Sequence, residues 1–160
     1  MKFSGVAARA AMALAVTVAT VAATVPAQAA DSLENAEKLR KLDVMLMVTG
    51  LRCRTGADNF NAEYGRFTSS HMAELNAAGA QLKAQMAARY GAAGANRALD
   101  RLSTTMANTY GNGHPWLSCA ELKTAAASLA QVRGHATLLE AADQLLAGGR
   151  GTEMAMAHRR

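Results

Sequence analysis

Residues 31–55 read DSLENAEKLRKLDVMLMVTGLRCRT, and their apolar residues recur at intervals of three and four. That spacing is typical of a helix that buries one face. Asp31 stands three residues before Glu34, so the two side chains can satisfy the free N–H groups of a helix start. Because the apolar face is wide, we expect this helix to lie at the centre of a bundle. The residues of that face are Leu39, Leu42, Leu46 and Cys53, widened by Met45, Val48 and Leu51.

Downstream of this helix, the same periodicity predicts further helices separated by glycines, and no segment alternates as a strand does. The first of them is either one long helix weakened at Gly65 or two helices broken within residues 66–70. Ser118, three residues before Glu121, forms a second capping box. The expected helices span residues 60–90, 95–110, 118–132 and 138–147, with Gly91, Gly111, Gly113, Gly134, Gly148 and Gly149 between or after them.

These patterns together predict an all-α fold, a small bundle of four to five helices with one disulfide. The chain of 160 residues is long enough for one domain, which we place at residues 30–149. Residues 150–160 have no apolar periodicity and are predicted to be a disordered tail.

Residues 1–29 are predicted to be a secretory signal peptide. Lys2 and Arg9 precede an apolar stretch rich in alanine, valine and threonine, and Ala27 and Ala29 form a small-residue cleavage site. The alternative is an uncleaved membrane anchor. No cysteine follows the site, so the sequence does not predict a lipid anchor. Cleavage after Ala29 would place the protein in the periplasm or outside the cell, with no membrane span.

The positive charge of the chain is concentrated at its two ends. The formal net charge is +5, and removal of Lys2 and Arg9 with the signal leaves 15 basic against 12 acidic residues. Within residues 30–149 the excess is a single positive charge, because the tail carries three arginines and one glutamate. A nucleic-acid-binding domain concentrates basic residues on its folded part. We therefore expect no nucleic acid as a partner.

Cys53 and Cys119 are the only cysteines, and export would place them in an oxidising compartment. A disulfide between them is the leading prediction. The competing interpretation is a reactive thiolate at Cys53, because Arg52 and Arg54 flank it and cations lower the pKa of a thiol. The chain has no Cys-x-x-Cys pair for thiol exchange and no Cys-x-x-Cys-His for covalent haem attachment.

Residues 112–116 read NGHPW and hold the only tryptophan of the chain. His114 and Trp116 are the candidate binding residues, since tryptophan is an amphipathic anchor and histidine a polar contact. The alternative is structural: a tight turn whose tryptophan fills one end of the bundle beside the predicted disulfide. The residues alone leave both interpretations open.

Histidine and methionine residues offer weaker sites for a metal or haem. His71 lies on the apolar face of the second expected helix, where it is either a hydrogen-bonded residue at the core boundary or a ligand opposite Met45 or Met47. His135 has the same two interpretations. Residue types that bind monovalent copper occur, at a loose spacing, in the tail at Met154, Met156 and His158. We predict no resident metal and no cofactor.

Several stretches carry a resemblance to a known group of proteins: residues 39–43, 51–54, 98–101, 107–111 and 116–119, together with Phe60, Tyr64 and Phe67. They resemble small exported helical proteins of unknown function from Gram-negative bacteria. Members of that group often carry the label S-adenosyl-L-homocysteine hydrolase, an enzyme that is far longer and has a dinucleotide-binding fold. The chain has no Gly-x-Gly-x-x-Gly motif, so the resemblance implies a helical fold and export and transfers no catalytic residue.

The sequence contains no catalytic constellation. Phosphate-binding loops, Gly-x-Ser-x-Gly elbows and His-Glu-x-x-His zinc motifs are absent, and the carboxylates are scattered over the expected exposed helix faces. We therefore predict that the protein is not an enzyme but a small periplasmic helical protein with a binding or structural role. The residues do not identify its partner, for which another periplasmic protein is the candidate. The alternative is a carrier of a non-covalent ligand, haem or metal within the bundle or the tail.

Overall fold

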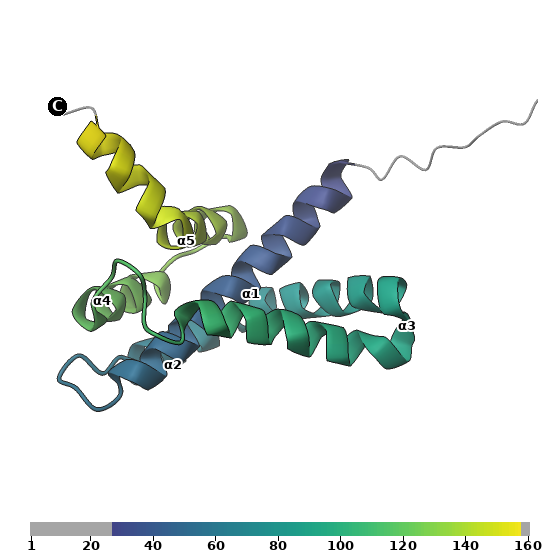
Figure 1. The fold of residues 1–160 in the computed structure, drawn as a ribbon, viewed down its shortest axis with the longest axis horizontal. Helices are drawn as coiled ribbons and strands as arrows, with labels where there is room; N and C mark the ends of the chain where they lie inside the picture. Colours follow the sequence, from purple (N-terminus) through teal and green to yellow (C-terminus); the bar gives the residue numbers. More distant parts are fainter. Residues whose placement is uncertain (1–26, 158–160) are drawn as a thin grey trace, which may run out of the picture.

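The computed structural model describes the backbone of residues 27–157 and the side chains of residues 31–147. Five helices make up this part of the chain, and none of its residues forms a strand (Figure 1). The predicted all-α fold with one disulfide is thereby confirmed. Most of the predicted signal peptide lies outside the described residues, as do residues 158–160. The helices are α1 (Ala27–Cys53), α2 (Asn61–Ser70), α3 (Met72–Tyr110), α4 (Cys119–Leu129) and α5 (His135–Ala157).

α1 is the central helix and contacts each of the other four. Figure 1 shows α4 and α5 to the left of α1 and the turn of α3 to its right. The predicted apolar face is buried, since Leu39, Leu42 and Leu46 are at most 1% exposed. Leu51 differs from the prediction: it lies in the last turn of the helix and is 54% exposed.

Both ends of the described chain are helical beyond the predicted limits. α1 begins at Ala27 instead of near Asp31, because alanine, which fills most of the intervening positions, is the best helix former. α5 continues through the glycine pair at 148–149, where an end was predicted, to Ala157. Glycine costs about 1 kcal/mol in a helix interior and does not by itself end a helix. The backbone of residues 150–157 of the predicted tail belongs to α5, whereas their side chains and residues 158–160 lie outside the described residues.

α2 and α3 are separate helices that meet at His71. This residue has φ −116° and ψ 21°, outside the helical region, and caps both helices. Its Nε2–H donates to the backbone oxygen of Leu129 at 2.8 Å, which ties the joint to α4. Gly65 lies inside α2 and does not interrupt it. Of the two alternatives for this segment, two broken helices are confirmed, with the break immediately after residues 66–70.

α3 is a hairpin of two helical arms that turns at Gly91 (Figure 1). Gly91 has φ 72° and ψ 162°, a backbone conformation that essentially only glycine adopts. The first arm completes the helix predicted over residues 60–90, and the second is the helix predicted over residues 95–110. Both arms are buried along one side, at Leu82 in the first and at Ala98 in the second.

The capping box at the start of α4 is formed as predicted. The Glu121 N–H donates to Ser118 Oγ at 3.3 Å, and the Ser118 N–H donates to the Glu121 carboxylate at 2.8 Å. A short turn that contains Gly134 then separates α4 from α5, as the sequence predicted. The two helices are therefore close neighbours along the chain.

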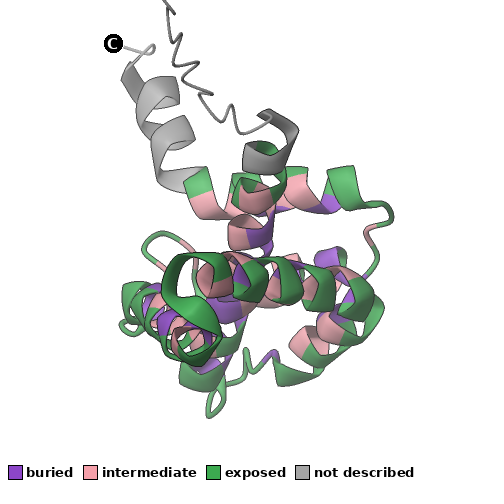
Figure 2. Cartoon of the chain, turned by 90° about the vertical axis from the view of Figure 1, so that its right-hand side faces the viewer, coloured by how far each residue is buried: buried purple, intermediate pink, exposed green. Residues whose placement is uncertain are grey.

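The core is one continuous cluster to which all five helices contribute. Figure 2 shows the buried residues on the inward faces of the helices and the exposed residues on their outer faces. Phe60, just before α2, and Phe67, within it, are fully buried. In the described part of the chain, no helix has the length and apolar character needed to cross a membrane.

Candidate functional site

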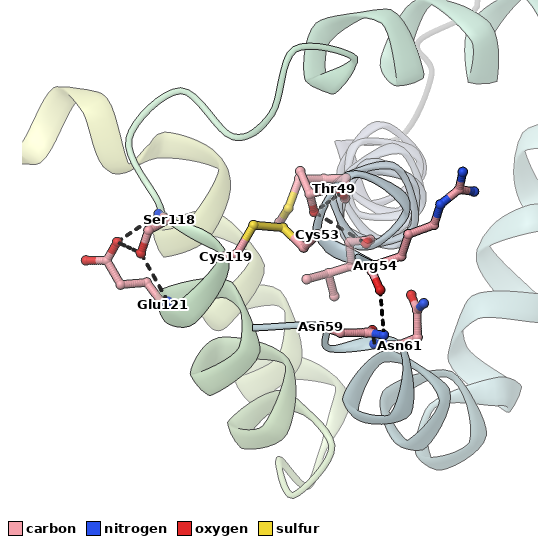
Figure 3. Close-up of a disulfide and its surroundings, with 10 residues drawn as sticks. Thr49, Cys53, Arg54, Asn59, Asn61, Ser118, Cys119 and Glu121 are labelled. Carbon is pink, nitrogen blue, oxygen red and sulfur yellow. Dashed lines mark hydrogen bonds between the residues drawn. A yellow bond between two sulfur atoms is a disulfide. The ribbon is translucent and has the colours of Figure 1, made fainter. Parts of the chain in front are cut away.

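A disulfide joins the end of α1 to the start of α4 (Figure 3). Cys53 and Cys119 are 66 residues apart in the sequence, and their Cα atoms are 5.8 Å apart. The predicted pairing is confirmed, and neither cysteine is a free thiol in the structure. On the chain-entropy model, closing a loop of this length stabilises the fold by about 4 kcal/mol. The bond also fixes the end of the segment that precedes α4.

Residues 111–118, here called the Trp116 loop, connect α3 to α4 and are held at both ends. Tyr110, which precedes the loop, is buried, and Cys119, which follows it, is in the disulfide. Arg52 of α1 adds a third attachment, because its Nη1 donates to the Gly111 carbonyl at 3.1 Å. The end of α1 therefore holds the loop through a covalent bond and a hydrogen bond.

His114 organises the inside of the Trp116 loop. Its Nδ1 accepts a hydrogen bond from the Leu117 N–H at 3.2 Å, so the proton of the neutral ring is on Nε2. Its ring stacks on Tyr110 at 5.8 Å between centroids and meets Trp116 edge-on at 4.8 Å. Burial lowers the pKa of His114, and a weaker interaction with the Leu145 backbone acts in the opposite direction. The loop is therefore built around the neutral imidazole.

Trp116 stands at the surface on this framework. The residue is 42% exposed although its ring packs against His114. Two surface hollows meet at the ring: one of about 490 Å³ between α4 and α5, and one of about 560 Å³ between α1, α3 and α5. The ring is thus packed on one side and available for contact on the other.

The hollow between α4 and α5, here called the α4–α5 groove, has mostly apolar walls. One face of each helix and part of the Trp116 loop line it. Among the lining residues, Glu121 alone carries a formal charge. The lining residues are Trp116, Leu117, Glu121, Ala125, Ser128, Leu129, Val132, Ala141, Gln144 and Leu145.

The second hollow has charged walls over the apolar side chains of Met106, Trp116 and Leu146. Lys38 Nζ of α1 lies 2.8 Å from a carboxylate oxygen of Asp143 of α5 and bridges the two helices. Such a partly exposed ion pair contributes at most about 1 kcal/mol. Both signs of charge occur along the walls, so this hollow does not select strongly for anions or cations. The other charged lining residues are Glu34, Glu37 and Lys41.

A polar cluster between α1, α2 and α3 was missed by the sequence analysis. Tyr64 Oη donates to Asp43 Oδ1 at 2.9 Å, and Arg40 Nη2 donates to Ser103 Oγ at 3.2 Å. Burial, followed by the nearby Asp43 carboxylate, raises the pKa of Tyr64 well above its usual value. These partners are 21 and 63 residues apart, so helical periodicity carries no signal for them. Because its groups bond to one another, the cluster is an internal link between three helices.

The residues considered for a metal or haem lie in different surroundings. His71 is 3% exposed and Met45 is fully buried, whereas Met47 is 40% exposed. His135 is exposed at the start of α5. Within the described residues, no group of three or more His, Cys, Asp or Glu side chains is placed to hold a metal ion. The side chains of Met154, Met156 and His158, the weaker candidates for copper in the tail, lie outside the described residues.

Comparison of the chain with protein-family models, with curated proteins and with solved structures finds no match. The resemblance to small exported helical proteins therefore stays a prediction. Function has to be inferred from the geometry of the Trp116 loop, the two hollows and the disulfide.

Proposed function

We propose that the protein is an exported interaction module that binds a partner protein through the Trp116 loop. The observation that carries the proposal is that Trp116 is 42% exposed on a loop held by the disulfide and packed on His114. Tryptophan is enriched among the few residues that dominate binding energy at protein interfaces. An exposed tryptophan that is already held in place loses little conformational entropy when a partner covers it.

Three attachments keep the Trp116 loop in one conformation before a partner arrives. Cys119 ties it covalently to α1, Arg52 bonds to its first residue, and His114 bonds to its interior at Leu117. The first two attachments join the loop to α1, which is anchored in the core, and the third holds the interior of the loop. A binding surface organised in this way gains affinity because less order has to be created on association.

Export is the second part of the proposal. It is supported by the predicted signal peptide over residues 1–29 and by the disulfide, because disulfides persist in oxidising compartments such as the periplasm and the extracellular space. We place the protein in the periplasm or outside the cell, where the partner is another exported protein. The role is binding and not catalysis, since the sequence offers no catalytic constellation.

A second candidate function, carriage of a non-covalent haem or metal, has one observation in its favour. The His71 Nε2–H donates to the Leu129 carbonyl, which leaves the lone pair on Nδ1, and Nδ1 is buried without a hydrogen-bond partner. Metal-ligating histidines commonly donate their other ring N–H to a backbone carbonyl in this way. A carrier would keep one ligand per chain through native purification, whereas an interaction module would not.

Photo-crosslinking in cells tests the Trp116 loop as the contact site. p-Benzoylphenylalanine replaces Trp116 in one variant and Tyr90 in another, because Tyr90 is also aromatic and exposed, at 51%, beside the distant turn of α3. We expect one defined crosslinked species from position 116 and none from position 90. Equal yields at both positions, or no crosslink at either, would contradict the proposal.

A further inference from the structure

The shape of the α4–α5 groove suits the binding of a helix. Its α4 wall includes Glu121, Ala125 and Leu129, which recur every four residues, and its α5 wall includes Ala141 and Leu145 at the same spacing. At 1.5 Å per residue, the α4 wall from 121 to 129 is about 12 Å long, or about two helical turns. A third helix can enter a hollow between two such helix faces and pack its own apolar stripe against them.

Several apolar side chains that line the α4–α5 groove are partly exposed to solvent. Leu117, Val132 and Leu145 are half-buried, and Leu129 beneath them is 2% exposed. Covering such side chains is favourable, because apolar surface leaves water. The polar residues Ser128 and Gln144 are among the lining residues and are exposed, so they can bond to the polar flank of an occupant.

The end of the groove at the start of α4 carries a negative charge that persists at neutral pH. Glu121 accepts hydrogen bonds from the Ser118 N–H at 2.8 Å and from Ser118 Oγ at 2.7 Å, and these bonds lower the pKa of its exposed carboxyl. Trp116, five residues earlier, lines the same groove. The face of a tryptophan ring attracts cations, and so does a carboxylate. This end of the groove therefore favours a lysine or arginine side chain.

We propose that the α4–α5 groove binds a basic amphipathic helix of a partner protein. The apolar stripe of that helix covers Val132 and Leu145, and one of its lysine or arginine side chains lies against Trp116 and Glu121. This inference rests on the proposed function, because it names the chemistry of the partner. A second copy of the chain fits less well, since a two-fold pairing over the groove brings two Glu121 carboxylates into one interface.

The fluorescence of Trp116, the only tryptophan, reports occupancy of the groove in the intact chain. Two synthetic helical peptides of about 18 residues are compared, with leucine along one face and either lysine or glutamate on the other. We expect the lysine peptide to shift the emission to shorter wavelength saturably and to bind about tenfold more tightly than the glutamate peptide. The chain is net basic, so unspecific attraction would favour the glutamate peptide. Equal affinities, or no saturable shift, overturn the proposal.

Glu121→Gln separates the charge of the groove from the folding of α4. Glutamine also serves at this position of a capping box, so the helix start is retained. We expect the affinity for the lysine peptide to fall about fivefold, with a thermal unfolding midpoint close to that of the wild type. An unchanged affinity in the folded variant contradicts the role assigned to Glu121.

Ala125 and Ala127 provide a matched pair of positions on α4. Ala125 lines the α4–α5 groove, Ala127 lines a different hollow between α2 and α4, and both are half-buried. A125R is expected to abolish the fluorescence shift and A127R to retain it, with circular dichroism verifying that each variant is folded. Loss of the shift in both folded variants, or in neither, overturns the proposed site.

These experiments distinguish failure of the helical partner from failure of the interaction module. Crosslinking at position 116 without a preference for the lysine peptide supports the interaction module and refutes the basic helix as its partner. A dimer in light scattering that A125R dissociates assigns the groove to a second copy and also overturns the inference. Absence of both crosslinking and peptide binding refutes the proposed interaction module as well as the inference about its partner.

Discussion

Among single residues, His114 contributes most to the conformation of the Trp116 loop. Its Nδ1 can accept the Leu117 N–H only while that nitrogen is unprotonated. Protonation would turn the acceptor into a donor and place a positive charge in a partly buried site between Tyr110 and Trp116. The loop therefore keeps its binding conformation best when the imidazole is neutral.

Acid is expected to destabilise the protein through His114. Because burial lowers the pKa of this residue in the folded state, the unfolded chain takes up the proton more readily. The contribution to the free energy of unfolding is fully present above the ordinary pKa of 6.5 and is lost as pH falls through the lower folded-state pKa. Urea unfolding at about pH 7.5 and about pH 5 measures the loss. His114→Asn should lose less stability between these pH values, and an equal loss would refute this role.

The cap of α4 gives a second prediction for a single residue. Ser118→Ala is expected to lower the free energy of unfolding by about 1 kcal/mol, because the Glu121 N–H loses its acceptor. Thr124→Ala is the control, since this exposed hydroxyl of the same helix bonds only to the carbonyl one turn earlier, and a change within about 0.5 kcal/mol is expected. A loss in Ser118→Ala no larger than that of the control, in urea unfolding, would count against the cap.

Single-residue features could be predicted where both partners are close in the sequence. Ser118 and Glu121 are three residues apart, so the capping box is visible in the sequence itself. The hydrogen bond between Tyr64 and Asp43 could not be found in this way, because it depends on how α1 and α2 pack. The exposure of Trp116 was left open for the same reason, since it depends on the neighbouring helices.

Among the helices, the hairpin of α3 depends on a single glycine at its turn. Gly91→Ala is expected to destabilise the fold by about 1–3 kcal/mol, because a Cβ disfavours the backbone conformation at φ 72° and ψ 162°. Gly79→Ala is the matched control: Gly79 lies within the first arm, and an added Cβ meets no atom within 4 Å. The control should be stabilised by about 0.5–1 kcal/mol in urea unfolding. A G91A variant as stable as the wild type would refute the special role of this turn.

Helices were predictable as elements, whereas their ends were predictable only where a local signal marks them. Gly91 and Gly134 mark real interruptions, both at positive φ. The break at His71 was one of two open alternatives, because its bond to Leu129 joins residues 58 apart. The glycine pair at 148–149 predicted an end that α5 does not have, since glycine weakens a helix without preventing it.

The disulfide stabilises the whole molecule. Replacement of Cys53 and Cys119 by serine is expected to lower the free energy of unfolding by about 4 kcal/mol, because the bond closes a loop of 66 residues. The loop would also lose one of its anchors, so the affinity for the lysine peptide should fall. Urea unfolding with and without reductant provides the control: reductant should weaken the wild type and leave the double variant unchanged. A wild type of equal stability after verified reduction would contradict this expectation.

The architecture of the whole molecule could be predicted only in part. The helical periodicity indicated a helical bundle, because periodicity is a local pattern. The predicted export and the presence of two cysteines indicated one disulfide. The α4–α5 groove could not be predicted, because periodicity shows which faces of two helices are apolar but not the angle at which the helices diverge. The single charge of the groove at Glu121 becomes meaningful only once that geometry is known.

An intact native mass spectrum of the protein recovered from the exported fraction of cells, recorded with and without reductant, distinguishes an exported interaction module from a carrier. We expect the mass of residues 30–160 less two hydrogens, the return of both hydrogens on reduction, and no bound small molecule. A stoichiometric extra mass that matches haem, a metal ion or a small organic molecule would make the protein a carrier. Retention of residues 1–29 in all of the recovered protein would contradict cleavage of the signal peptide.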